Sequence, residues 1–210
     1  DRWLARRTRA LLERSGVLID DREGWALSTT VAASWPMAWL DYCEAVGASG
    51  RRGVSAAIAL STLLDSAFTG HPAAPALASY VRSEQRSAAA SAAPEAHALD
   101  VRLSALAQRQ RQAGSLGAHR EALAQAMTAL GADVTMQRDE AGRQLLELIE
   151  ALPAHAPAGC RLDAFRALLG FALESRRFHD AGIASPVTMI GLDAAIAQSH
   201  DAVLVLGASD

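Results

Sequence analysis

The sequence predicts a mainly α-helical chain that carries a small parallel β-sheet. Two observations point to this fold class. Apolar residues recur at helical spacing through the interior, for example Leu99, Leu103 and Leu106. Short apolar runs that are typical of strands occur only near the two ends, at 17–19, 187–192 and 202–206. Parallel strands require a long crossover connection, and here the helical interior itself would be that crossover.

This pattern divides the chain into two parts. The two ends, 1–46 and 181–210, are expected to build the α/β unit together. The segment between them, 47–180, is expected to form an inserted, all-helical subdomain. The late strands are near-continuous apolar runs, as in strands that are buried on two faces. Since nothing evident would cover the far side of the last strand, we expect the chain to be a piece of a larger protein.

Local signals place the individual elements. Gly16 ends the first helix as its C′ residue, and Ser28 or Thr29 caps the second helix. Ser115 and Asp163 are N-cap candidates further along the chain. Connections are expected at 20–24, 47–53, 87–94 and 153–159. Helices are expected over 2–15, about 28–46, 54–67, 74–86, 95–113, 116–131, 139–151 and 162–178.

The charge balance excludes some functions. The formal net charge is −3, which provides no overall basic signal for nucleic-acid binding. All 20 basic residues are arginine, so no lysine is available for a G-x-x-x-x-G-K-[ST] phosphate loop. We therefore expect no ATP binding of that kind and no cofactor in this chain.

Composition and cysteine usage indicate the class of protein. Hydrophobic residues make up 50% of the chain and charged residues 20%, which is enough apolar material for a core. Cys43 and Cys160 match neither a zinc pattern nor a disulfide framework, and we interpret them as reduced cysteines. No signal peptide and no apolar run of membrane length occurs in the sequence. A cytoplasmic location without a membrane partner is therefore expected.

The last stretch resembles a motif of superfamily-1 helicases of the UvrD/RecB type, V-x-L-M-T-x-H-x-S-K-G-L-E-F-x-x-V-F-L-x-G. Asp193, Ala195 and Ile196 stand where that family has His, Ser and Lys, and 197–200 replaces Gly-Leu-Glu-Phe. This loss of polar groups, with the strand framework retained, resembles the degenerate helicase domain of AddB-like proteins, the RecB-family exonucleases. The framework positions are kept without a gap by Val187, Met189, Ile190, Val203, Val205 and Gly207.

Residues 6–30 are similar to the opening of the second RecA-like domain in the same family. There a helix ends in Gly, a short strand follows, and a Gly-Trp-x-Leu-Ser-Thr-Thr turn starts the next helix. That turn is Gly24 to Thr30 in this chain. The resemblance implies a partial RecA-like domain with a helical insert, the same layout that the residue pattern predicts. It also implies a parent exonuclease of double-strand-break repair that works beside a helicase partner subunit.

Candidate nucleic-acid contacts lie near the start of the chain. In the family, an arginine that Arg6 matches lies near the nucleotide, whereas Ala5 replaces the serine that precedes it. A tryptophan before three hydroxyls at a helix start fits base stacking and phosphate binding. The competing interpretation is that the tryptophan packs in the core and the hydroxyls cap the helix. The candidate contacts are therefore Arg6, Trp25, Ser28, Thr29 and Thr30.

No catalytic or metal site is expected. Asp20, Asp21 and Glu23 lie beside Arg22 and are interpreted as a solvated turn rather than as metal ligands. The histidines are scattered, and no Gly-x-Ser-x-Gly elbow is present. The Asp and Glu-x-Lys pattern of the AddB-like nuclease domain is excluded because the chain has no lysine.

These observations favour a non-catalytic part of an AddB-like helicase-nuclease. It would act as a scaffold that binds single-stranded or unwound DNA weakly during the processing of DNA ends. The alternative is a helical protein–protein interaction module with no DNA contact of its own. A third interpretation is a self-contained α-helical domain, which separation of the two ends would favour.

Overall fold

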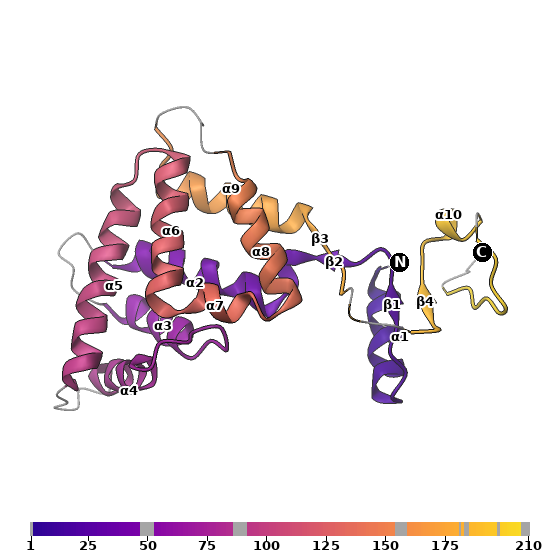
Figure 1. Ribbon diagram of the computed structural model, residues 1–210, viewed down its shortest axis with the longest axis horizontal. Helices are drawn as coiled ribbons and strands as arrows, with labels where there is room; N and C mark the ends of the chain where they lie inside the picture. The colour runs from indigo at the N-terminus through magenta and orange to yellow at the C-terminus, as the bar shows by residue number, and fades with distance from the viewer. Residues whose placement is uncertain are drawn as a thin grey trace. The chain divides into compact units, whose positions relative to one another are not determined.

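The computed structural model describes residues 2–46, 53–85, 92–153, 159–180, 182, 185–196 and 198–206, apart from the side chains of Arg2, Arg6 and Gln85. As the sequence predicts, the chain is mainly helical and includes a small two-stranded parallel sheet (Figure 1). Its contacts divide it into two compact units. The terminal unit comprises Asp1–Trp25 with Arg177–Asp210, and the helical unit is Ala26–Arg176. Most of the expected connections at 47–53, 87–94 and 153–159 lie outside the described residues.

The terminal unit begins with helix α1 (Arg2–Arg14). Gly16 follows it with φ +78°, the left-handed conformation that glycine adopts without steric cost. The amide of Val17 donates to the carbonyl of Leu12 at 2.9 Å, and the amide of Gly16 donates to Glu13 at 3.0 Å. The predicted role of Gly16 as the C′ residue is confirmed by this geometry.

The two ends of the chain meet in one parallel sheet. Strand β1 (Asp20–Asp21) pairs with β4 (Thr188–Met189) in the register Asp20 to Thr188 and Asp21 to Met189. A second sheet pairs β2 (Trp25–Ala26) with β3 (Arg177–Phe178), and the short helix α10 (Leu192–Ala195) follows β4. The expectation of a small parallel sheet built from both ends is confirmed.

The predicted extents of the strands were wrong. The first strand was expected at 17–19 but forms at Asp20–Asp21, because the Asp20 amide donates to the Val187 carbonyl at 2.9 Å. The strand expected at 187–192 is limited to Thr188–Met189, since α10 begins at Leu192. Residues 202–206 form no strand, and the side chains of 203–206 are exposed rather than buried on two faces. An apolar run does not become a strand without a neighbour that completes its backbone hydrogen bonds.

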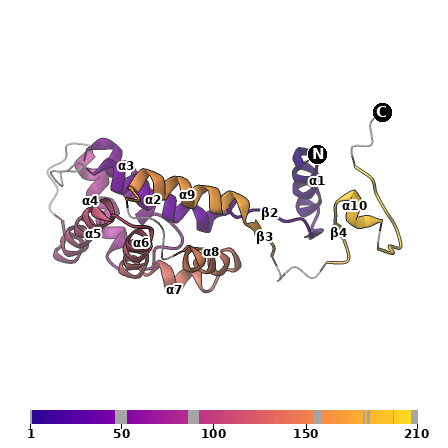
Figure 2. The ribbon, with the colours of Figure 1, turned by 90° about the horizontal axis from the view of Figure 1, so that it is seen from above.

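The helical unit holds the remaining helices. In Figures 1 and 2, α2, α3 and α9 lie on one side of this unit and α5, α6, α7 and α8 on the other. The helix α7 was not predicted. The elements are η1 (Leu27–Thr29), α2 (Val31–Ala45), α3 (Val54–Leu64), α4 (Ala74–Gln85), α5 (Pro94–Gln112), α6 (Leu116–Leu130), α7 (Ala132–Met136), α8 (Glu140–Ala151) and α9 (Leu162–Ser175).

The core of the helical unit is built around α2, which contacts α3, α5, α8 and α9. Its aromatic side chains Trp35, Trp39 and Tyr42 are each at most 1% exposed. From the sequence, this helix was expected to belong to the terminal part, 1–46. The compact units divide at Ala26 instead, because most of the α2 surface is covered by other helices.

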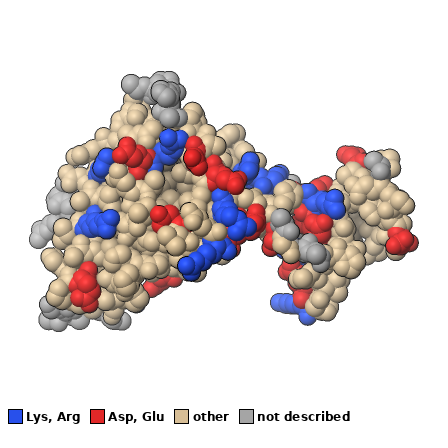
Figure 3. Space-filling view, in the orientation of Figure 1, with Lys and Arg blue, Asp and Glu red and all other residues tan. Residues whose placement is uncertain are grey.

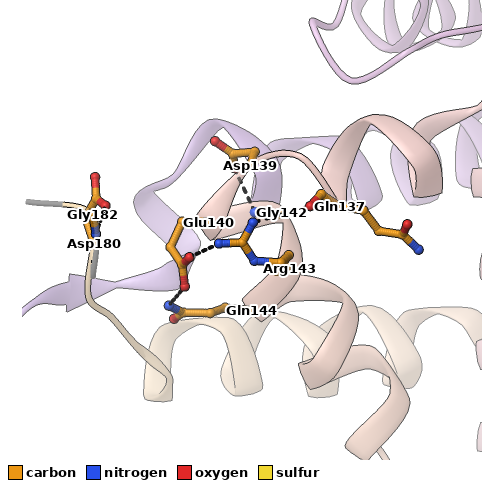
Figure 4. Close-up of polar contacts among 8 residues, drawn as sticks. All are labelled: Gln137, Asp139, Glu140, Gly142, Arg143, Gln144, Asp180 and Gly182. Atoms are coloured by element: carbon orange, nitrogen blue, oxygen red, sulfur yellow. Dashed lines mark hydrogen bonds and ion pairs between the residues drawn. The ribbon is translucent and has the colours of Figure 1, made fainter.

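N-capping side chains start several of these helices. Ser115 accepts from the Ala118 amide at 3.2 Å, as predicted. Asp163 does not cap α9, since it lies inside the first turn and Arg161 occupies the N-cap position. Asp139 caps α8 by accepting from the Gly142 amide at 2.7 Å (Figure 4). Among the described residues, no helix combines the length and the apolar character needed to cross a bilayer.

Candidate nucleic-acid interface

Trp25 packs within the terminal unit. Its ring lies edge-on to Phe178, with the ring centroids 5.0 Å apart and the planes at 62°. The guanidinium of Arg9 lies 4.0 Å from the centroid of the indole ring. Arg9 is held there by an ion pair with Glu13, Nε to Oε1 at 2.6 Å. A base can stack on that face of Trp25 only by displacing the guanidinium of Arg9.

The three candidate hydroxyls belong to the helical unit and donate to protein groups. Thr30 is the N-cap of α2, since its Oγ1 accepts from the Ala33 amide at 3.3 Å and donates to the Leu27 carbonyl at 2.7 Å. The hydroxyl of Thr29 donates to the Ala26 carbonyl at 2.7 Å. The expected cap at 28 or 29 was therefore wrong, because η1 occupies those positions.

Ser28 faces a carboxylate. Its hydroxyl donates to Oε2 of Glu174 on α9. A phosphate at this place would meet the negative charge of Glu174, which opposes binding. The start of this helix thus shows capping geometry. The predicted site is divided between the units, since Trp25 belongs to the terminal unit and the three hydroxyls belong to the helical unit.

Helix α1 carries most of the basic charge of the terminal unit. It contains five arginines and one acid, as its sequence RWLARRTRALLER shows. The side chain of Arg6, the candidate taken from the family resemblance, lies outside the described atoms. The guanidinium of Arg7 lies 5.4 Å from the ring centroid of Trp3, an indole that is 64% exposed.

On the face that Figure 3 shows, arginines of the helical unit lie beside acidic residues. Ion pairs also join its helices. Arg166 of α9 pairs with Asp41 and Glu44 of α2, and Arg109 pairs with Glu121 at 3.1 Å. Exposed pairs of this kind leave little net charge to attract a polyanion.

A buried polar network that was not predicted joins four helices of this unit. The Trp39 indole donates to the Gln110 side chain at 3.4 Å, and the Gln110 amide lies 3.0 Å from Nδ1 of His119. Nε2 of His119 lies 3.1 Å from the Cys160 carbonyl, and its ring stacks on Phe165 at 4.9 Å. Desolvation by burial lowers the pKa of His119, so the ring is neutral and structural at physiological pH.

The sequence contained a signal for this burial. Gln110 continues the apolar stripe of Leu99, Leu103 and Ala107 along α5. His119 lies between Leu116 and Leu123 on the apolar face of α6. Polar residues that fall on an apolar stripe are expected to be buried and hydrogen-bonded to one another.

A cleft of about 520 Å³ lies beside this network. Burial raises the pKa of its thiol, Cys160, so the thiol stays protonated and is a poor nucleophile. Arg161 and Asp163 pair across 3.3 Å at the edge of the cleft. The lining therefore has no dominant charge, and it consists of Glu44, Arg111, Ala113, Gly114, Gly159, Cys160, Arg161, Leu162 and Asp163.

The acidic turn of the terminal unit forms local contacts. Asp20 pairs with Arg22 at 3.0 Å, and Asp21 accepts from the amides of Glu23 and Gly24 at 3.2 Å. Within the described part of the chain, no group of three or more potential metal ligands comes together. Comparison of the chain with protein-family models, with curated proteins and with solved structures found no match.

Proposed function

We propose that this chain is a non-catalytic, DNA-binding scaffold of an AddB-like helicase-nuclease that processes DNA ends in double-strand-break repair. The observation that carries the proposal is the parallel pairing of β1 with β4. The two stretches that resemble the helicase family are far apart in the sequence, and this pairing brings them into one unit. A partial RecA-like domain interrupted by a helical insert requires such a pairing.

The charge of α1 supports a DNA contact in the terminal unit. Arg7 and Arg14 are exposed on this helix, and its acid Glu13 pairs with Arg9. Guanidinium groups bind phosphate oxygens in a bidentate geometry. The expected binding is weak and sensitive to salt, because the chain as a whole is slightly acidic with a net charge of −3.

A fluorescence-anisotropy titration of a labelled single-stranded oligonucleotide tests this function. The affinity should fall with rising salt, with a slope of about −0.7 per phosphate contact. The double variant Arg7→Gln/Arg14→Gln should weaken binding. The charge-matched control Arg102→Gln/Arg138→Gln, which alters exposed arginines of the helical unit, should not. Absence of binding at low salt would contradict the proposal.

A second function is favoured by one specific observation. Large apolar side chains are exposed on the helices of one side of the helical unit, and exposed apolar surface marks interaction sites. These are Val31 of α2, Val54 and Ile58 of α3, and Leu168 and Phe171 of α9. The alternative is therefore that the helical unit docks a partner subunit and the chain makes no DNA contact.

A matched pair of variants tests the alternative. Phe171 is 71% exposed on α9, and Val101 is 57% exposed on α5 at the other side of the unit. If the unit docks the helicase subunit of the proposed complex, Phe171→Glu should abolish binding in a pull-down between purified subunits. Val101→Glu should have no effect. Equal binding by both variants would remove this surface from consideration.

A further inference from the structure

We infer that single-stranded DNA contacts the terminal unit through one stripe of α1, with a base stacked on Trp3 and phosphates held by Arg7 and Arg14. The inference rests on the proposed function and specifies its site and ligand. It replaces Trp25 and the hydroxyls of 28–30 as the expected place of contact.

The four tryptophans of the chain differ in their exposure to solvent. Trp35 and Trp39 are 1% and 0% exposed in the core of the helical unit, and Trp25 packs against Arg9 and Phe178. Trp3 is 64% exposed. Since an indole is costly to leave in water, a surface tryptophan of this kind is suited to a ligand with a π-face.

The neighbours of Trp3 form one continuous surface. Trp3, Arg7, Leu11 and Arg14 are spaced by four, four and three residues, so they follow one stripe along the helix. All four are exposed. At about 1.5 Å per residue the stripe is roughly 16 Å long. That length accommodates several nucleotides of an extended strand rather than a single small anion.

Charge complementarity favours nucleic acid as the occupant. The stripe carries two guanidinium groups and no carboxylate. Glu13 points away from it by helical spacing and is paired with Arg9 at 2.6 Å. The Arg7 guanidinium lies 5.4 Å from the centroid of the Trp3 ring, farther than the 4.0 Å between Arg9 and Trp25, and the Trp3 side chain stays 64% exposed beside this cation. Duplex DNA offers phosphates but no exposed base face, which selects the single-stranded form.

An abasic oligonucleotide separates stacking from simple attraction to phosphates. Anisotropy titrations at low salt would use a normal single strand and an abasic strand of equal length. The intact chain should bind the normal strand about ten-fold more tightly, as one stacked base predicts. Trp3→Ala should lose the preference for the normal strand but bind the abasic strand as tightly as the intact chain does. Trp3→Phe should retain most of the preference. Arg7→Gln should weaken both and reduce the salt slope by about one contact.

The control is Val101→Ala, which removes another exposed apolar side chain, at 57% exposure, from the helical unit. It should bind like the intact chain. Far-UV circular dichroism of Trp3→Ala checks that this variant folds. If the chain binds the normal strand and Trp3→Ala binds it equally well, the stacking site is wrong and the proposed function stands. Equal binding of normal and abasic strands by the intact chain also overturns the site. If the intact chain binds neither strand, the proposed function itself fails.

Discussion

Two helical glycines show how one residue type serves different purposes. A Cβ on Gly142, in the first turn of α8, would lie 2.3 Å from the carbonyl oxygen of Met136. The backbone of α7 can approach α8 this closely only because the side chain is absent. A Cβ on Gly170, in α9, would meet no atom within 4 Å. The first glycine is required by packing and the second is not.

Alanine substitutions should therefore have opposite effects at these positions. Gly142→Ala should lower the free energy of unfolding by about 1–3 kcal/mol, because the backbone must move to admit a methyl group. Gly170→Ala should raise it by about 0.5–1 kcal/mol through helix propensity. Urea denaturation of both variants checks this. Equal destabilisation would show that Gly170 also has a packing role.

His119 makes stability depend on pH. Burial lowers its pKa in the folded state below the usual value of 6.5, and Gln110 donates to the nitrogen that would take the proton. The unfolded chain therefore binds the proton more readily than the folded chain below about pH 6.5. As the pH decreases below about 6.5, the free energy of unfolding should therefore decrease, until His119 is also protonated in the folded state.

Urea denaturation at pH 7.5 and pH 5.5 measures this dependence. At pH 7.5, His119→Gln should have a lower free energy of unfolding than the intact chain. Between pH 7.5 and pH 5.5, its free energy of unfolding should decrease less than that of the intact chain. His97→Gln, at an exposed histidine of α5, should behave like the intact chain. An unchanged pH dependence in His119→Gln would mean that other groups cause it.

At the scale of elements, the start of α2 depends on Thr30. Its hydroxyl satisfies the Ala33 amide, one of the donors that lack a partner within the helix. Thr30→Ala should lower the free energy of unfolding by about 1 kcal/mol, as for other threonine caps. Thr29→Ala should cost less, because the Thr29 hydroxyl makes one local bond to a carbonyl.

Thermal or urea unfolding of the two variants gives the comparison. The same proteins test the candidate site, since a capping hydroxyl should not affect DNA affinity. If Thr30→Ala lost DNA binding without losing stability, the hydroxyl would be a ligand contact and the capping interpretation would be wrong.

Helices and strands differ in how well local sequence predicts them. The end of α1 at Gly16 and the start of α6 at Ser115 were predicted correctly because the signals act within one turn. The apolar run at 203–206 has high strand propensity but remains unpaired. A strand depends on a partner that is distant in sequence, and no local signal specifies that partner.

At the scale of the whole molecule, the helical unit contains its own core, and a hydrogen bond joins its two ends. The amide of Leu27 donates to the carbonyl of Arg176 at 2.8 Å, which joins the two ends of this unit. Units with a separate core and adjacent ends are able to fold alone. Where the structure describes the terminal unit, its strands are two residues long and few of its side chains are buried.

The isolated polypeptide 26–176 should therefore be folded. We expect helical circular dichroism, cooperative urea unfolding and a stability within about 1 kcal/mol of the main transition of the full chain, since additivity holds between independent parts. A polypeptide that lacks cooperative unfolding would show that the terminal residues are needed for the helical core.

The candidate site was only partly predictable. The basic character of α1 follows from composition and helical spacing, which require no tertiary information. The surroundings of Trp25 did not follow, because Phe178 reaches the ring from the other end of the chain. The exposure of Trp3 could not be predicted, because exposure is not encoded in the residue type. The buried pair Gln110 and His119 was signalled by the apolar stripes but was not recognised.

The sequence by itself determined most of the helical segments, the lack of a lysine for a phosphate loop and the expectation that both ends share a parallel sheet. These follow from local propensity, residue chemistry and the constraint on parallel connections. Only the tertiary structure decided that α2 belongs to the helical core, that Thr30 is a cap and that Trp3 is the solvent-exposed indole. The physical reason is that burial and strand pairing arise from contacts between residues far apart in the chain, which no local pattern records.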